Sequence, residues 1–247
     1  MSARLAQIWR YPIKAIGAEH LSEVTLTPDQ PLPGDRAWAL AHDAAKLEPG
    51  VTWFRKMNFL RGVAGPELMA ITATCDAQTI TLRHPTAGEI TVDPATSEGE
   101  ARLLAWIAPL WPDSRPQPAR LIHTGQAMTD NNAPWISILS LDSLRHLQGQ
   151  MGIDLDVRRF RGNLWIDDLP AWSEFDLIGR EIQVGETRLR VDERIERCRA
   201  TCVDPATGQE SGEVLDALET HYGHRDFGVF ATVLDGGTIQ PGDRISA

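Results

Sequence analysis

The chain has 247 residues, which is more than one average domain and less than two large ones. Hydrophobic residues make up 42% and charged residues 23%, a composition that excludes a disordered or collagen-like chain. The net charge of −10, from 24 basic and 34 acidic residues, argues against a nucleic-acid partner, because such proteins need a basic face.

Targeting features and cysteine content narrow the class further. No run approaches about 18 apolar residues and the N-terminus lacks the apolar core of a signal peptide, so we expect neither a membrane helix nor a secretory signal. Three cysteines are too few for a disulfide framework, which predicts a cytoplasmic protein. Of the 24 basic residues 21 are Arg, which reflects either genome composition or the binding of an anionic ligand by some of them.

The first 95 residues are predicted to form strands and turns. Strands are expected, in chain order, at 7–11, 37–40, 70–75, 79–83 and 89–92. Short polar turns join the last three, which predicts an antiparallel meander. The irregular stretch 46–68, with Trp53 and Phe54 expected to be exposed, is either a lid or a long loop.

Helices enter after the meander. The pattern Ser97–Glu100 has the form of a capping box and precedes an apolar stripe, which predicts a helix there. The Pro-rich stretch 112–118 predicts a boundary between domains 1–117 and 118–247. Beyond it we expect helices from about Ser140 to Gly149 or Gly152 and over 211–222, with strands at 162–166, 181–184, 187–191, 230–234 and 237–245. The fold class is therefore mainly β with accessory helices (α+β), in two β-rich domains, the second a β-barrel.

The segment around Cys198 is chemically the most informative. Arg194, Arg197 and Arg199 flank this cysteine, and neighbouring positive charge favours the thiolate, which binds metals and attacks electrophiles. Cys202 with two downstream histidines, His221 and His224, would complete a zinc site, but an extended 198–202 segment would hold the two thiols about 13 Å apart. A Cys–His hydrolase is a further alternative, and no residue pattern singles out its histidine.

Five short motifs follow one another along the chain. They are Tyr11-Pro12-Ile13-Lys14-Ala15, Gly34-Asp35-Arg36-Ala37-Trp38, Arg159-Phe160-Arg161-Gly162-Asn163-Leu164, Arg197-Cys198 with Thr201 and Val203-Asp204-Pro205, and Asp226-Phe227-Gly228 with the Gly237-Thr238-Ile239 ending. In this order they resemble the MOSC proteins, the family of the molybdenum-cofactor sulfurase C-terminal domain, with an N-terminal MOSC β-barrel domain attached. The resemblance covers almost the whole chain and is greatest to the mitochondrial amidoxime-reducing components and their bacterial counterparts.

The resemblance implies a molybdenum cofactor, in which a pyranopterin (molybdopterin) holds the metal. It implies that Cys198 is the catalytic residue and the single protein thiolate on molybdenum, since a soft thiolate suits such a metal. Lys14, Arg36 and Arg161 would neutralise the cofactor's phosphate, for which Arg is suited by its bidentate donors. Asn163 would contact the pterin, and Asn131 and Asn132 would make further cofactor contacts.

Three positions depart from the family pattern. Ala15 stands where relatives often have Ser, Gly162 where Pro is more usual, and Cys202 where Thr is common. None of the three changes a proposed metal ligand. The loss of a hydroxyl at Ala15 does bear on the phosphate contacts.

The activity implied is the reduction of a small N-hydroxylated compound to an amine or amidine. Electrons would come from a separate protein of ferredoxin, flavin reductase or cytochrome b5 type, because no cluster, haem or flavin motif is visible before the chain stops at Ala247. We expect no nucleic-acid and no membrane partner. The alternatives are a sulfur-carrier or cofactor-transfer module with a persulfide on Cys198, and a binding module that keeps the fold without the chemistry.

Overall fold

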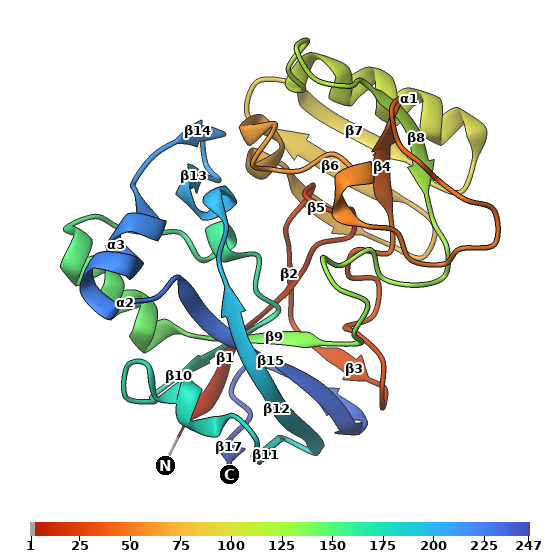
Figure 1. The fold of residues 1–247 in the computed structure, drawn as a ribbon. Coiled ribbons are helices and arrows are strands. Elements are labelled where there is room, and N and C mark those ends of the chain that lie inside the picture. Colours follow the sequence, from red (N-terminus) through yellow and green to blue (C-terminus); the bar gives the residue numbers. More distant parts are fainter. Residues whose placement is uncertain (1–2) are drawn as a thin grey trace.

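A computed structural model describes residues 3–247 and shows two β-rich lobes (Figure 1). The larger lobe is built on an eight-stranded sheet in the order β17-β11-β12-β15-β9-β10-β1-β2. Its strands are β1 Arg4–Arg10, β2 Glu19–Leu21, β9 Ile136–Ser140, β10 Leu164–Asp167, β11 Glu181–Val184, β12 Thr187–Glu196, β15 Asp226–Asp235 and β17 Ile245–Ser246. Neighbouring strands are antiparallel except β9 and β10, which are parallel.

The smaller lobe contains the predicted meander. An antiparallel sheet of three strands is joined by a separate strand pair, with the bounds β5 Thr72–Cys75, β6 Ile80–His84 and β7 Gly88–Val92, and β4 Ala39–His42 with β8 Pro118–Ile122. The helix α1 (Ser97–Ile107) packs on this lobe through buried Leu103 and Ile107. Its cap lies one residue earlier than predicted, because Thr96 rather than Ser97 accepts the first hydrogen bond, from the N–H of Gly99 at 3.0 Å.

Two further helices pack on the large sheet. They are α2 (Leu141–Met151), capped by the Ser140 side chain and ended by Gly152 at φ +66°, and α3 (Val214–Tyr222), which begins three residues later than predicted. Their apolar faces share a core with Trp165 and Phe227 of the sheet. Within residues 3–247 no helix has the length and apolar character needed to cross a bilayer.

Short elements complete the chain. The 3-10 turns are η1 Lys56–Asn58, η2 Pro66–Ala70, η3 Ala108–Leu110, η4 Val157–Phe160, η5 Ser173–Leu177 and η6 Arg199–Cys202, and the remaining strands pair as β3 Val24–Leu26 with β16 Gly237–Ile239 and β13 Val203–Asp204 with β14 Gln209–Glu210. The stretch 46–68 is irregular, as predicted, apart from η1 and the start of η2. The expectation that Phe54 is exposed is wrong, because its ring is buried against Phe59.

The sheets cross the predicted boundary after residue 117. β1 and β2 precede that boundary but pair within the large sheet, and β3 pairs with β16 near the other end of the chain. β8 follows the boundary but pairs with β4 in the small lobe. The division into 1–117 and 118–247 stays a prediction. In the structure, strands from before residue 117 belong to the large lobe, and one strand from after it belongs to the small lobe.

The strand pairing of the large sheet does not run around a complete barrel, whereas the sequence predicted a barrel-like core. Its end strands β2 and β17 do not pair with each other in the described residues 3–247. They have only three and two residues, too few to complete a ladder. Besides a bridge between Arg4, on β1, and Arg244, three backbone hydrogen bonds join Ala3 and Leu5 to residues 242–245, so the start of β1 lies beside the segment that leads into β17. The class, mainly β with three α-helices in two lobes, is confirmed.

Candidate functional site

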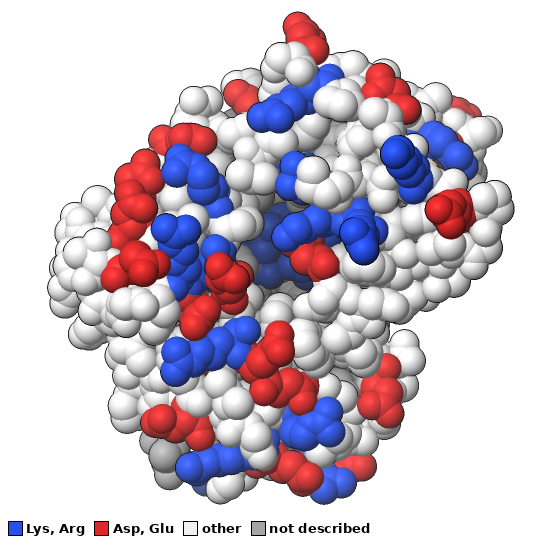
Figure 2. All heavy atoms as spheres, in the orientation of Figure 1, with Lys and Arg blue, Asp and Glu red and all other residues white. Residues whose placement is uncertain are grey.

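A cavity of about 650 Å³ lies between the two lobes and gathers most of the predicted site residues. Figure 2 shows it as a central hollow with basic side chains in its depth. Eight basic and five acidic residues line it, so the cavity is positive inside a chain whose net charge is −10. The basic residues are Lys14, Arg36, Lys56, Arg61, Arg159, Arg161, Arg194 and Arg197. Such a local excess attracts an anion.

The basic end of the cavity is built around the ring of Tyr11, directly after β1. The guanidinium carbons of Arg36 and Arg161 lie 5.1 and 4.3 Å from the ring centre, within cation–π range. The Tyr11 hydroxyl donates to the Gly162 carbonyl at 3.3 Å, and its backbone N–H donates to Asp35 at 2.8 Å. Burial raises the pKa of Tyr11, so the ring stays neutral and serves as a platform for the two cations.

Arg36 and Arg161 adopt an unusual backbone conformation. Their φ angles are +51° and +48°, a region that costs energy for residues other than Gly and is found at functional sites. Arg36 forms an ion pair with Asp35 and donates to the Arg161 carbonyl at 2.9 Å. Burial, together with the nearby charge of Arg36, lowers the pKa of Arg161 to about 10, so both groups remain charged at neutral pH.

Lys14 is a buried cation at the same end. Its Nζ donates to the Met128 carbonyl at 2.8 Å and to Asp130 at 2.5 Å. Burial lowers the pKa of Lys14, while the Asp130 carboxylate acts in the opposite direction. Asp130 also lies 3.4 Å from Lys56 of η1, so it bridges the two lysines at the cavity wall. The stretch 46–68 therefore contributes directly to the basic end.

The three predicted asparagines differ in their positions. Asn163 lines the cavity, but its Oδ1 accepts from the Ser137 hydroxyl at 2.8 Å and its Nδ2 donates to the Trp9 carbonyl, so its side chain joins β9, β10 and β1. Asn131 also lines the cavity. Asn132 is not among the lining residues, and its Oδ1 accepts from Gln126 at 2.6 Å.

Cys198 follows the last residue of β12 by two positions. It lines the cavity and is exposed, whereas Cys202 is buried in the core beneath α3. The Cys198 carbonyl accepts from the N–H and the hydroxyl of Thr201, at 3.1 and 3.0 Å, which closes the η6 turn. An accessible thiol at the wall of a positive cavity can ligate a metal or act as a nucleophile.

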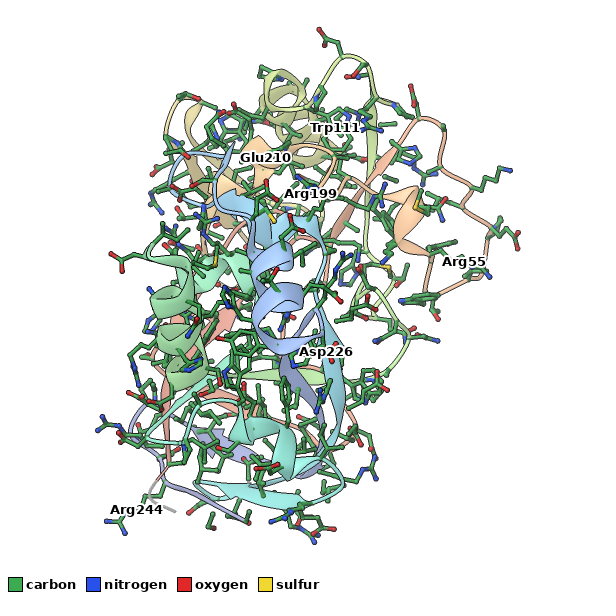
Figure 3. All side chains as sticks on the ribbon, turned by 60° about the vertical axis from the view of Figure 1, so that its left-hand side comes forward. Arg55, Trp111, Arg199, Glu210, Asp226 and Arg244 are labelled. Atoms are coloured by element: carbon green, nitrogen blue, oxygen red, sulfur yellow. The ribbon has the colours of Figure 1, made fainter. Side chains whose placement is uncertain are left out.

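The three arginines that flank Cys198 in sequence point in different directions. Arg199 is paired with Glu210 and Glu213, and Figure 3 shows Arg199 next to Glu210. Arg194 lies 3.6 Å from Asp226. Arg197 alone is turned into the protein, where it donates to backbone carbonyls. The Cys198 charge is among the causes that act on the pKa of Arg197, after the larger effect of burial, which lowers it to about 9.

Sequence reasoning gave no role to three basic residues of the cavity. Lys56, Arg61 and Arg159 all line it. Arg159 stood in a motif without an assigned role, and Lys56 and Arg61 lie in the irregular stretch, where spacing carries no information. Arg61, Arg159, Arg161 and Arg197 have no carboxylate within 4.0 Å among residues 3–247.

The zinc alternative is not supported by the geometry. In residues 3–247 no group of three or more His, Cys, Asp and Glu side chains is placed to hold a metal ion. The segment from Cys198 to Cys202 is a turn rather than extended, and it directs one thiol to the cavity and the other to the core. No histidine lines the cavity in the part of the chain that the structure describes, so the Cys–His hydrolase also lacks a base there.

Two family models match the chain and fix its class. The MOSC N-terminal beta barrel domain matches residues 2–108 and the MOSC domain matches residues 125–246. Together they span most of the sequence, and the chain therefore belongs to the MOSC domain proteins. The resemblance inferred from the five motifs is confirmed.

Relatives of known name fall into two groups. Human mitochondrial amidoxime-reducing component 1 is 25% identical, in a match that covers 98% of this chain and 82% of that protein. The molybdenum cofactor sulfurase of Anopheles gambiae is 30% identical, over 47% of this chain and only 16% of that protein, and the Drosophila melanogaster sulfurase is 31% identical over 38% and 12%. The chain thus spans a small part of the sulfurases it matches.

Two solved structures are similar. The YuaD protein from Bacillus subtilis aligns over 99% of this chain and 94% of its own, with a TM-score of 0.47 and 13% sequence identity. YiiM from Geobacillus stearothermophilus aligns over 44% of this chain and 52% of its own, with a TM-score of 0.34 and 16% identity.

The residues present fit an anionic, sulfur-bound metal cofactor. Arg159 is buried and its Nε has no hydrogen-bond partner in residues 3–247, although it belongs to the cavity lining. A buried guanidinium without a carboxylate is costly, and an anion in the cavity would offset that cost. An exposed thiol on the same wall supplies the soft ligand that such a metal prefers.

Proposed function

We propose that this MOSC protein is a molybdenum-cofactor-dependent oxidoreductase that reduces N-hydroxylated compounds to amines or amidines. The observation that carries the proposal is an exposed thiol, Cys198, on a cavity in which Arg159, Arg161 and Arg197 have no carboxylate partner among residues 3–247. The match to the amidoxime-reducing component over almost the whole chain supports a reductive activity.

The basic end of the cavity would hold the cofactor's phosphate. Arg161 offers a charged guanidinium that no carboxylate of residues 3–247 neutralises, and Lys14 and Arg36 lie beside it on the same loop cluster. Arg donors suit the paired oxygens of a phosphate. The proposed contacts to the pterin are Asn163, Asn131 and Asn132. The Nδ2 of Asn163 donates one N–H to the Trp9 carbonyl, and its second N–H would be the donor to the pterin.

Cys198 would bind the metal, and the molybdenum cofactor would supply the two-electron chemistry. Conversion of N–OH to N–H takes up two electrons and two protons and releases water. The chain's own part is to keep the site dry and oriented. Trp135 and Phe230 stack with ring centres 4.8 Å apart on the same cavity, and Val63 and Met69 add apolar surface from the other lobe.

We propose that the electrons reach the site from a separate ferredoxin, flavin reductase or cytochrome b5-type protein. The three cysteines of the sequence are fewer than the four ligands of an iron–sulfur cluster. We also keep a cytoplasmic location as a proposal, because it rests on the low cysteine content alone.

The second candidate is a sulfur-carrier or cofactor-transfer module. It is favoured by the matches to molybdenum cofactor sulfurases and by the accessibility of Cys198, which could carry a persulfide. The two candidates differ in what the purified chain contains. A reductase holds metal, whereas a carrier holds one extra sulfur on the thiol.

The test is elemental and mass analysis of protein from a host with an intact molybdopterin pathway, followed by turnover of an amidoxime and a hydroxylamine with a chemical reductant. We expect about one molybdenum per chain and turnover in the wild type and in Cys75→Ser, whose thiol lies in the other lobe. Cys198→Ser should have no turnover. Cofactor-loaded wild type that reduces no N-hydroxylated compound would contradict the reductase, and a Cys198 persulfide without metal would favour the carrier.

A further inference from the structure

The turn that carries Cys198 is held by two arginines, the half-buried Arg197 and the buried Arg159, whose hydrogen bonds run in opposite directions between η4 and the turn. Arg197, the residue before Cys198, donates to the Phe160 carbonyl at the end of η4, at 2.8 Å, and to the Phe227 carbonyl, also at 2.8 Å. The strand that delivers Cys198 is therefore tied to the segment that carries the Arg159–Asn163 motif.

Arg159 makes the return connection from η4 to the Cys198 turn. Its Nη1 donates to the Ser211 carbonyl at 2.6 Å and, at 3.4 Å, to the Thr201 carbonyl. Thr201 in turn donates twice to the Cys198 carbonyl. A chain of hydrogen bonds thus runs from Arg159 through Thr201 to the backbone of Cys198, and both ends of the η6 turn are fixed.

The same short segment also shapes the basic end of the cavity. Arg161, two residues after Arg159, stands over the Tyr11 ring and accepts at its carbonyl from Arg36. Arg159 therefore belongs to the segment that forms the basic end, and it donates to the carbonyls of Thr201, in the Cys198 turn, and of Ser211. Its side chain is only 4% exposed, so it is not available as a surface charge.

We propose that Arg159 is a positioning residue for Cys198, which acts through Thr201 to hold the thiol toward the cavity; this rests on the proposed role of Cys198 as the metal ligand. A Lys at this position keeps the charge, but as a compact, strongly hydrated ammonium on a flexible stem in place of the rigid guanidinium whose Nη1 reaches both carbonyls. Arg158, its neighbour, is the matched control, because it belongs to the same turn but pairs with Asp156.

The experiment measures how fast each thiol of the cofactor-free protein reacts with iodoacetamide, by peptide mass analysis, in Arg159→Met, Arg159→Lys, Arg159→Ala and Arg158→Met. Cys202 is buried in the η6 turn and reports its opening, while Cys75 in the other lobe is the internal reference. Loss of a charged hydrogen bond should raise Cys202 alkylation about tenfold to hundredfold in Arg159→Met. Guanidinium ion at concentrations below denaturation should restore protection in Arg159→Ala, and melting temperature is recorded for each variant.

A merely structural Arg159 predicts a different outcome. Arg159→Met would then expose Cys75 and Cys202 together, and guanidinium would rescue neither. Equal Cys202 rates in Arg159→Met and Arg158→Met would overturn the inference even with molybdenum bound in the wild type. Absence of molybdenum from the wild type would refute the proposed function, while the thiol protection would still decide the positioning role.

In the loaded protein, Arg159→Lys should lower kcat with little change in KM, because the substrate-facing wall of Trp135 and Phe230 is untouched. Arg158→Met should leave both values at the wild-type level. A rise in KM at constant kcat in Arg159→Lys would instead place Arg159 in substrate binding and would contradict the positioning role.

Discussion

The two ends of the cavity balance their positive charges in different ways. At the basic end, Lys14 and Arg36 are paired with the carboxylates of Asp130 and Asp35. Beside Cys198, Arg159 and Arg197 donate to backbone carbonyls instead. A carboxylate partner can be exchanged for the phosphate of a ligand, whereas a guanidinium bound to carbonyls fixes the backbone. The Nη1 of Arg159 thus holds the turn of the thiol, while its unpaired Nε stays available to an anion in the cavity.

Burial sharpens this contrast. The Asp130 side chain is 57% exposed although its partner Lys14 is buried, so the ion pair can open toward solvent. Arg159 and Thr201 are both buried, although Ser211, its other carbonyl partner, is exposed, so Arg159 is fixed mainly from the protein side. Substitutions at the two ends should therefore differ in kind, in ligand affinity at the first and in folding stability at the second.

The largest effect is expected at the thiol itself. Cys198→Ser should abolish reductase activity, by more than about a thousandfold, because the hydroxyl does not replace a soft thiolate ligand. The melting temperature should hardly change, since the Cys198 side chain is exposed. Activity assays and thermal unfolding check this, and a variant that keeps substantial turnover would remove Cys198 from the chemistry.

Arg197→Met should remove the hydrogen bonds that tie the Cys198 segment to η4 and β15. It leaves the buried carbonyls of Phe160 and Phe227 without their donors, which should lower the free energy of unfolding by about 4 kcal/mol. Arg199→Met, which removes only exposed ion pairs, should cost less than about 1 kcal/mol. Urea unfolding of both variants measures the difference, and equal losses would show that the inward orientation of Arg197 has no energetic weight.

Glu174 is a buried carboxyl group that forms no ion pair within residues 3–247, in contrast to the arginines above that have no carboxylate. It predicts that the stability of the fold depends on pH. Glu174 is fully buried, accepts from the Ser143 hydroxyl, and burial raises its pKa to about 7. The folded state then holds a proton that the unfolded chain releases near pH 4.5, so stability is greatest below that value and falls by about 3 kcal/mol as pH rises to about 7.

The pH series is measured by urea unfolding of the wild type and of Glu174→Gln. The variant should lack this fall in stability, while Glu219→Gln, an exposed glutamate paired with Arg225, should retain it. If the wild type and Glu174→Gln follow the same curve between about pH 4.5 and 7, Glu174 does not titrate in that range.

At the carboxylate-paired end, Lys14→Met should weaken binding rather than folding. Loss of one charge-assisted contact should reduce the affinity for inorganic phosphate about tenfold to hundredfold. Lys46→Met is the control, because Lys46 lies on the irregular stretch outside the cavity lining. Calorimetric titration with phosphate tests both, and equal affinities would exclude Lys14 from the anion site.

Asp130→Asn should have the smallest effect, with the opposite sign. Removal of the carboxylate that competes for Lys14 and Lys56 should tighten phosphate binding about twofold to fivefold, the range of an exposed ion pair. The same titration measures it. Weaker binding in this variant would mean that Asp130 helps to hold the anion and is not displaced by it.

Local patterns in the sequence predicted the local parts of the fold. Strand-forming runs joined by short polar turns over 70–92 identified the meander, and Ser140 and Gly152 marked both ends of α2, because caps and turns depend on neighbours in the chain. The pairing of β1 with β10 joins residues that are far apart in sequence, so no local pattern reveals it. The backbone hydrogen bonds that join Ala3 and Leu5 to residues 242–245 could not be predicted for the same reason.

For the candidate site, too, the sequence predicted which residues belong to it but not how their side chains are oriented. Motif resemblance placed Lys14, Arg36, Arg161 and Cys198 in one cavity, and the structure brings all four to its wall. The motifs could not show that Arg197 turns inward while Arg199 faces solvent. The two arginines flank Cys198 and have the same side chain, so they differ only in the residues that surround them in the fold. That distinction separates a residue that holds the thiol from one that does not.

The most direct test of the central claim is molybdenum X-ray absorption on the wild type and on Cys198→Ser after reconstitution with cofactor. We predict molybdenum in the wild type with one more sulfur ligand than in the Cys198→Ser protein. The same number of sulfur ligands in both, or a wild type that binds no molybdenum from an intact pathway, would contradict the account.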